Sequence, residues 1–247
     1  MPQVFIIILV VVGAYLIGNV NFATLITKLK KQDIRKVGSG NPGTMNMLRN
    51  FGKGLGALTL FLDILKGAVP CVLGWFFVGG IGFAPEGTLP PVFNGFFFTG
   101  GSRLGLHIAG FSVIIGHVFP VFMRFKGGKG IASAIGVCAV AQPAIALLTL
   151  VVGVVFIILT KMGSLGSFVI ISAPLAVEGF FVSRILADGA QNAAILASLI
   201  LIFLLFSLTV FTHRKNIVKL FSGTESKTVL FGKNKAAKNP QEAVLRK

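Results

Sequence analysis

The sequence predicts an all-α integral membrane protein with seven transmembrane helices, its N-terminus outside and its C-terminus cytoplasmic. The first observation is composition: 54% of the 247 residues are hydrophobic and only 12% are charged, about half the charge of a typical soluble domain. The second is the length of apolar runs such as 54–84, which exceed the roughly 18 residues that mark a membrane helix. The third is that these runs do not alternate, which excludes barrel strands.

The predicted helices follow in order from the apolar runs and the polar residues between them. The first run has no Lys or Arg before it, so we expect a retained helix rather than a cleaved signal peptide. The long run 131–160 contains Gln142-Pro143, and a proline either kinks a helix or starts a new one. That run therefore makes one crossing or two. With a break there, the predicted spans are 4–27, 54–83, 105–123, 128–141, 144–160, 165–187 and 191–212.

The distribution of positive charge decides between the two topologies. Seven crossings place 20 of the 23 lysines and arginines on one side, which the positive-inside rule assigns to the cytoplasm. Six crossings would send the nine basic residues beyond position 212 outside. Seven spans are therefore preferred, with 84–104 as an external loop. The chain then forms one membrane domain, residues 1–232, followed by a basic cytoplasmic tail, residues 233–247.

Charge and composition also exclude other classes of function. The net charge of +16 suggests nucleic acid, but the basic residues lie beside hydrophobic spans, which favours anionic headgroups and anionic substrates as partners. Cys71 and Cys138 lie inside apolar runs and are expected to pack as small hydrophobic residues. The three histidines lack metal-ligand spacing, so we expect no metal and no cofactor.

Asp63, Lys66 and Glu178 lie well inside predicted spans, where an unpaired charge costs a few kcal/mol. Asp63 and Lys66 are three residues apart in the second span and can face each other. We expect them to form a structural ion pair that faces the bundle interior and orients the site. Glu178, in the sixth span, has no evident partner.

Three polar segments interrupt the apolar chain, all on the predicted cytoplasmic side. They are 38–46, 116–130 and 213–227. Each combines glycines with small polar side chains and fixed positive charge. Glycines let backbone N–H groups approach an anion closely, and lysine or arginine neutralises it. The three segments therefore predict one phosphate-binding site.

These segments do not match the phosphate motifs of soluble folds. Gly38–Gly43 reads G-x-G-x-x-G, but no strand precedes it, as a dinucleotide-binding unit requires. Gly130 stands where a Walker loop carries serine or threonine. A simple turn and a positive-inside anchor at Lys126 and Lys129 are the alternative interpretations, and His117 is either interfacial or a substrate ligand. Three glycines at a helix start favour a ligand loop.

Together these residues resemble the signature motifs of the bacterial acyl-phosphate:glycerol-3-phosphate acyltransferases, the PlsY family. The resemblance spans about residues 4–230. Thr44-Met45 replaces the family's Ala-Thr, and Lys219 stands where arginine is usual. The matching motifs are Gly-Ser-Gly-Asn-x-Gly at 38–43 with Asn46, Leu-Arg at 48–49, Asp-x-x-Lys-Gly at 63–67, Gly-His-x-Phe-Pro to Phe-Lys-Gly-Gly-Lys-Gly at 116–130, Ser-Leu-x-Ser at 164–167, Asn-Ile at 216–217 and Gly-x-Glu-x-Lys at 223–227.

The resemblance implies transfer of a fatty acyl group from acyl phosphate to the 1-hydroxyl of sn-glycerol 3-phosphate, at the cytoplasmic face of a bacterial inner membrane. The products are lysophosphatidic acid and inorganic phosphate. No Ser-His-Asp or Cys-His arrangement stands out, so we expect direct transfer without an acyl-enzyme. The missing His-x4-Asp motif argues against an acyl-CoA donor. A transporter of an anionic phosphorylated solute is the alternative, and its site should lie near the membrane midplane.

The resemblance also assigns roles to residues of the three segments. Arg49, Lys126 and Lys129 are expected to clamp phosphates, and Ser39 and Asn41 to hold the acyl-phosphate head with the glycine N–H groups. The expected partners are the two substrates and membrane lipids, and the oligomeric state is not predicted. The expected catalytic residues are Ser39, Arg49, His117, Lys126, Asn216 and Glu225. The expected substrate-binding residues are Gly38, Gly40, Asn41, Gly43, Asn46, Gly127, Gly128, Lys129, Ser164 and Ser167, with His117, Ser164, Asn216 and Glu225 orienting glycerol phosphate.

Overall fold

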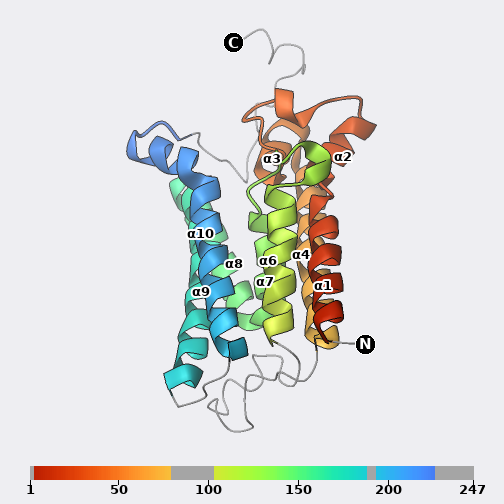
Figure 1. The fold of residues 1–247 in the computed structure, drawn as a ribbon. Coiled ribbons are helices and arrows are strands. Elements are labelled where there is room, and N and C mark those ends of the chain that lie inside the picture. Colours follow the sequence, from red (N-terminus) through yellow and green to blue (C-terminus); the bar gives the residue numbers. More distant parts are fainter. Residues whose placement is uncertain (1–2, 79–102, 188–192, 226–247) are drawn as a thin grey trace.

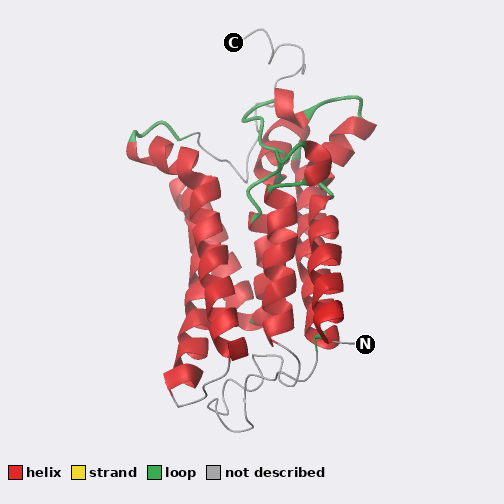
Figure 2. Ribbon diagram, viewed as in Figure 1, coloured by secondary structure: helices red, strands yellow, loops and turns green. Residues whose placement is uncertain are grey.

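A computed structural model describes residues 3–78, 103–187 and 193–225 as a bundle of helices (Figure 1). The described part contains no strand (Figure 2). Long helices lie side by side along one axis, and the short elements gather at one end, where α10 also finishes. The elements are α1 (Gln3–Asn19), α2 (Phe22–Leu29), the 3-10 turn η1 (Ile34–Lys36), α3 (Thr44–Phe51), α4 (Lys53–Phe77), α6 (Arg103–Val118), the 3-10 turn η2 (Val121–Met123), α7 (Ile131–Ala141), α8 (Pro143–Thr160), α9 (Gly163–Ala187) and α10 (Ala193–Phe221).

Six helical segments in the described ranges are long and apolar enough to cross a membrane. α7 is the exception, since its 11 residues extend only about 16 Å. The predicted break at Gln142-Pro143 is confirmed, because α7 ends at Ala141 and α8 begins at Pro143. Proline is favoured at the first helical position, where its missing N–H leaves no bond unmade. The six segments are Gln3–Leu29, Lys53–Phe77, Arg103–Met123, Pro143–Thr160, Gly163–Arg184 and Ala193–Phe221.

The first predicted span, 4–27, is not one continuous helix. α1 ends at Asn19, and α2 starts at Phe22. The side chain of Asn21 accepts a hydrogen bond from the N–H of Thr24 at 2.8 Å and so caps a new helix. Asn21 also donates to the Pro42 carbonyl at 3.0 Å, which ties the corner to the first polar segment.

Other predicted boundaries are wrong by several residues at the membrane surface. α6 ends at Val118 and not at 123, because Pro120 follows, and the next helix begins at Ile131 and not at 128. α10 continues to Phe221, well past the predicted end at 212. Its last turns carry exposed basic residues, which a helix tolerates once it leaves lipid. The predicted loop 84–104, up to residue 102, and the tail 233–247 lie outside the described residues.

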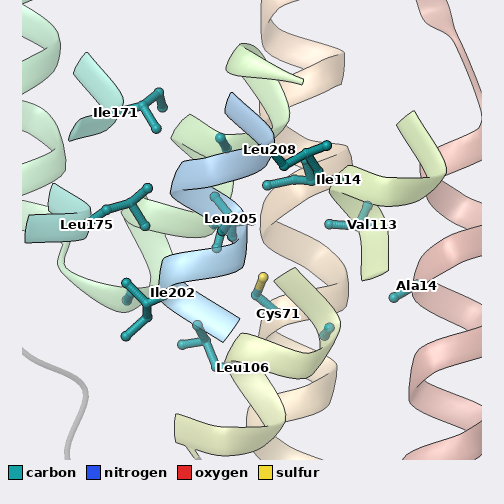
Figure 3. Close-up of a cluster of buried hydrophobic side chains, with 14 of the residues drawn as sticks. Ala14, Cys71, Leu106, Val113, Ile114, Ile171, Leu175, Ile202, Leu205 and Leu208 are labelled. Atoms are coloured by element: carbon teal, nitrogen blue, oxygen red, sulfur yellow. The ribbon is translucent and has the colours of Figure 1, made fainter. Parts of the chain in front are cut away.

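Small residues bring the helices close together. A Cβ on Gly18 of α1 would collide with the Val113 carbonyl on α6, and a Cβ on Gly67 of α4 would meet Ser133 of α7. Helices in lipid associate through such close packing, because lipid is as apolar as their side chains. Farther from the small residues, apolar side chains of α9 and α10 meet those of α6 (Figure 3). Both cysteines are buried free thiols there, as expected.

The described helices contain two buried pairs of a carboxylate with a lysine or an arginine. Asp63 and Lys66 are 2.8 Å apart and almost fully buried, which confirms the predicted pair. Glu178 of α9 does have partners, contrary to the sequence analysis. Its carboxylate accepts hydrogen bonds from Arg103, at the start of α6, and from Gln142 at the α7–α8 break. These partners come from distant parts of the chain, so no local pattern reveals them.

The close crossing of α1 and α6 yields a test of the packing. We expect Gly18→Leu to destabilise the protein by about 1–3 kcal/mol, because the new side chain has no space. Gly13→Leu, on the same helix, is the matched control, since a Cβ there meets nothing within 4 Å. Thermal unfolding in detergent measures both. Equal melting temperatures for the two variants would contradict this account of the crossing.

Candidate functional site

The first polar segment forms a loop whose shape is set by Asn46. Its side-chain amide donates to two loop carbonyls, including that of Val37 at 2.9 Å, and its oxygen accepts from the Ser39 N–H at 3.2 Å. Gly38 and Gly40 have φ of +60° and +69°, a conformation that suits glycine. Asn46 is only 2% exposed. The structure therefore places it beneath the loop as a support.

Ser39 and Asn41 remain at the surface of this loop. The Ser39 side chain is exposed, and its hydroxyl accepts a hydrogen bond from the Asn41 N–H at 3.4 Å. Gly43 then begins α3 without a side-chain cap. The free N–H groups of a helix start carry partial positive charge that favours anions. The predicted loop ligands other than Asn46 thus lie together at the start of α3.

The second polar segment folds back onto the end of α6. The N–H of Gly127 donates to the Val118 carbonyl, and that of Gly128 donates to the His117 carbonyl, both at 3.1 Å. A Cβ at Gly127 would collide with the His117 carbonyl, and one at Gly128 with the imidazole. These glycines permit close approach of the chain to α6. Their N–H groups point at protein carbonyls, so the geometry does not offer them to a substrate as expected.

A chain of hydrogen bonds joins four of the predicted residues. The Lys129 ammonium donates to Asn216 Oδ1 at 2.6 Å, and Asn216 Nδ2 donates to Ser164 Oγ at 2.5 Å. The Ser164 N–H then donates to Glu225 Oε1 at 3.0 Å. The four side chains come from the second segment, α10, the start of α9 and the residues after α10. The structure thus unites three motifs that are far apart in sequence.

Positive charge exceeds negative charge around this chain. Burial lowers the pKa of the Arg49 guanidinium, and the nearby Glu225 carboxylate opposes that shift. Burial also lowers the pKa of Lys129 to about 8, opposed by Glu225 and reinforced by the positive charges of Arg49 and Lys219. Glu225 is the one carboxylate that perturbs both groups. An anion placed here would relieve the repulsion among the three cations.

His117 lies below the second segment in the wall of the bundle. It is 4% exposed, and its Nδ1 is 2.8 Å from the Lys66 ammonium. The imidazole therefore links the buried ion pair to the glycine loop above it. The sequence left its role open between an interfacial and a substrate-facing histidine, and that role stays a prediction.

Lys126 and Ser167 are also not joined to the hydrogen-bonded chain. The Lys126 side chain is exposed, and it is the backbone of this residue that is bonded: its carbonyl accepts from Arg35 at 2.8 Å, and its N–H donates to the Met123 carbonyl at 3.2 Å. The Ser167 hydroxyl donates to the Gly163 carbonyl within α9 at 2.9 Å. Lys126 lies at the rim of the site and Ser167 below Ser164. Their roles toward substrate stay predictions.

Sequence reasoning missed the residues that connect the segments. Arg35 bonds the second segment but lies in a basic stretch that was assigned to topology. Thr212 of α10 donates to the Lys129 carbonyl at 3.3 Å, and no pattern singled it out. Lys219 was noted only as a departure from the family motif, although its charge acts on Lys129. Of these residues, Lys219 alone has a signal in the sequence, because it continues the row of basic residues that Arg214 and Lys215 begin near the end of α10.

Comparison with known proteins gives a consistent result. The family model described as glycerol-3-phosphate acyltransferase matches residues 8–223. A glycerol-3-phosphate acyltransferase of Thermoanaerobacter pseudethanolicus is 37% identical over 229 residues, which cover 89% of this chain and 94% of the relative. The Aquifex aeolicus glycerol-3-phosphate acyltransferase is 34% identical over 215 residues, with 87% and 95% covered.

Two solved structures are similar along nearly the whole chain. One is PlsY, an integral membrane glycerol 3-phosphate acyltransferase, in its glycerol 3-phosphate form. It matches with a TM-score of 0.68 and 30% identity over 94% of this chain and 99% of that chain. The lysophosphatidic acid form matches with a TM-score of 0.64 and 28% identity, with 100% of each chain covered.

The lowered pKa of Lys129 predicts how anion binding depends on pH. Raising the pH through about 8 removes its positive charge, so sulfate, whose own charge is constant in this range, should bind more weakly. We expect Kd to rise about five- to tenfold between pH 7 and pH 9, measured by calorimetry, because the ammonium that donates the charge-assisted bond is largely deprotonated over this range. Lys129→Arg should bind sulfate almost equally at both values. A wild-type Kd that does not change would exclude Lys129 as an anion ligand.

Proposed function

The chain belongs to the glycerol-3-phosphate acyltransferase family and is a multi-pass integral membrane acyltransferase, and we propose that its acyl donor is an acyl phosphate. The fatty acyl group would pass to the 1-hydroxyl of sn-glycerol 3-phosphate, giving lysophosphatidic acid and inorganic phosphate. The observation that carries the proposal is the excess of positive charge that Arg49, Lys129 and Lys219 form around the Glu225 carboxylate among the described residues. Both substrates of this reaction carry a phosphate, so such a site suits donor and acceptor alike.

The hydrogen-bonded chain suggests how the acceptor is held. Lys129 and Arg49 would bind phosphate oxygens through charge-assisted hydrogen bonds, which are about twice as strong as neutral ones. Asn216 and Ser164 would fix the Lys129 ammonium and the Glu225 carboxylate relative to each other. The second oxygen of Glu225, Oε2, is buried and has no hydrogen-bond partner among the described residues. It can therefore accept a hydrogen bond from a glycerol hydroxyl.

The loop at the start of α3 would hold the donor. Ser39 and Asn41 lie at its surface, with Gly38, Gly40 and Gly43 shaping the backbone around them. Lys126, exposed at the rim and near Arg35, would add positive charge where the acyl-phosphate head enters. His117 would orient glycerol phosphate from below. The assignment of each residue rests on its place around the cation cluster and on the motif resemblance.

Direct transfer is the mechanism that these residues support best. The glycerol 1-hydroxyl oxygen would form a bond to the acyl carbon while the bond from that carbon to the phosphate oxygen breaks. The hydroxyl proton would pass to a phosphate oxygen, and the phosphate would leave. The acyl phosphate is already activated, so the protein supplies position and stabilisation of charge on the leaving phosphate.

We further propose seven crossings, with the N-terminus outside and the site at the cytoplasmic face of a bacterial inner membrane. α7 is too short to cross alone, but the segment 124–130 that precedes it adds to its reach from the site end. The start of α1 and the end of α10 lie at opposite ends of the bundle (Figure 1), as an odd number of crossings requires. Most lysines and arginines of the described ranges belong to the elements at the end of the bundle that holds the site. The positive-inside rule places that end in the cytoplasm.

The position of the site also favours an enzyme over a transporter. A transporter of anionic solutes is expected to bind near the membrane midplane. Arg49, Lys129 and Glu225 instead belong to the loops and helix ends at one end of the bundle. A lipid substrate can reach that position from the membrane, and a soluble phosphate ester can reach it from the cytoplasm.

The donor proposal is tested with purified protein and glycerol 3-phosphate. We expect lysophosphatidic acid to form at least about 100-fold faster from palmitoyl phosphate than from palmitoyl-CoA, measured by mass spectrometry. Arg49→Gln should lower kcat/KM for palmitoyl phosphate about 30- to 1,000-fold, since it removes roughly 2–4 kcal/mol of stabilisation. Arg103→Lys, at the opposite end of the bundle, is the control and should keep near-normal kinetics. Equal rates with the thioester would overturn the proposed donor.

The topology proposal is tested with single cysteines in a background without Cys71 and Cys138. A cysteine at Ser222 should react with a membrane-impermeant maleimide only after the cytoplasmic side is opened. A cysteine at Thr88, between α4 and α6 in the chain, should react in intact cells. Reaction of both from the outside would contradict seven crossings.

A further inference from the structure

We propose that Lys66 is a positioning residue for His117. Its ammonium holds the imidazole in the tautomer that carries the proton on Nε2, and this N–H serves the substrate site. The inference deepens the proposed function, because it rests on His117 acting toward glycerol phosphate. It adds a residue outside the cation cluster and states what that residue does.

The argument begins with the contacts of the Lys66 ammonium. Nζ donates to the Val20 carbonyl at 2.7 Å, lies 2.8 Å from His117 Nδ1, and forms the ion pair with Asp63 at 2.8 Å. The ring of Phe22 covers it at 5.6 Å from the ring centroid. An ammonium has three N–H donors and no acceptor. The three contacts therefore occupy it fully.

These contacts fix where the imidazole carries its proton. Because the ammonium can only donate, His117 Nδ1 must accept, and an accepting Nδ1 has no proton of its own. A neutral imidazole then carries its proton on Nε2, since the partner of one ring nitrogen determines the state of the other. Asp63 would favour the opposite tautomer. Its Oδ1 lies 4.0 Å from the same Nδ1 and would accept a hydrogen bond from it if Lys66 were absent.

The resulting Nε2–H lies directly under the second glycine segment. A Cβ on Gly128 would collide with Nε2, so the ring edge touches the backbone of that residue. The Gly128 N–H already donates to the His117 carbonyl at 3.1 Å. The side-chain hydrogen bond that the structure gives His117 among the described residues is the one from Lys66 to Nδ1, on the other side of the ring. The N–H is therefore available to a substrate oxygen beside the segment that carries Lys129.

The Lys66 ammonium makes more contacts than an ion pair with Asp63 alone would require. A pair that served only to neutralise Asp63 would not require contact with the α1–α2 corner and with an imidazole on α6. The other buried ion pair joins Arg103 to Glu178. It lies at the start of α6, at the end of the bundle far from the site. It provides a matched control for the loss of a buried charge pair.

The first experiment reads the tautomer without any change at Lys66. Wild-type protein with ¹⁵N-labelled histidine is studied in detergent by NMR, and His117→Gln assigns the His117 signals. We expect the chemical shifts of the Nε2–H tautomer. The Nδ1–H tautomer in the wild-type protein would overturn the proposal.

The second experiment separates positioning from charge balance. Lys66→Met alone leaves Asp63 as an unpaired buried charge and so endangers folding. Asp63→Asn with Lys66→Met removes both charges. We expect this double variant to fold, to lose the single Nε2–H signature and to lower kcat for lysophosphatidic acid formation at least 50-fold, with a smaller change in KM. Wild-type activity in the folded double variant would show that the pair is only structural and would overturn the proposal.

The control is Arg103→Met with Glu178→Gln, which removes the other buried pair. It should lower the melting temperature while leaving the His117 signals and kcat close to wild type. The tautomer readout does not depend on the acyl donor, so a failed donor assay leaves it standing. If His117 shows the Nε2–H tautomer but His117→Gln retains full activity, the positioning role of Lys66 is refuted while the donor proposal is not.

Discussion

The buried Lys66 ammonium connects the parts of the chain from which the site is built. It joins α4 to the corner between α1 and α2 through the Val20 carbonyl, and to α6 through His117. Within lipid a polar group without a partner costs several kcal/mol, so each of these contacts strongly constrains the helices that supply it. The corner carries the first glycine segment through Asn21, and His117 carries the second. Both glycine segments are thus placed relative to one buried charge.

At the surface of the site positive charge exceeds negative charge, whereas the two charges of the Asp63–Lys66 pair in the interior cancel. Asp63 compensates Lys66 inside the bundle, whereas the described residues place the Glu225 carboxylate among three cations, Arg49, Lys129 and Lys219. Mutual repulsion of cations opposes folding, and a bound phosphate removes that repulsion. The site is therefore arranged for a ligand that brings negative charge. Partial burial of Arg49 and Lys129 strengthens the attraction, because water screens charges less there.

The sequence predicted much of the fold, because transmembrane helices are selected by local composition. Apolar runs and Pro143 were sufficient to find the long apolar helices and the break between α7 and α8, but not the short helices α2 and α3. The corner at Val20 was missed because Asn21 ends a helix through its side chain, although the residues around it remain apolar. The partners of Glu178 were missed because they are set by tertiary contact between α6, α9 and the α7–α8 break.

The sequence predicted which residue types form the candidate site. It did not predict which of them support the loops and which face the site. Glycine, asparagine and lysine in one segment all suggest ligand binding, yet only the fold decides which of their atoms are already used. The Asn46 amide donates hydrogen bonds to the loop that it supports, and the Gly128 N–H donates to the His117 carbonyl. The Lys129 ammonium donates to Asn216 and so joins the second segment to α10.

The two buried ion pairs of the described helices lie in different surroundings. Toward the far end, Glu178 is enclosed by Arg103 and His107 of α6 and by Gln142 at the α7–α8 break, so its charge is matched by direct partners. Toward the site end, Lys66 contacts the Val20 carbonyl, His117 and Asp63, and the positive charges of Arg49, Lys129 and Lys219 lie above it around Glu225. The small residues at the crossings of α1 with α6 and of α4 with α7 hold the helices that connect the two ends close together, because their backbones are in direct contact.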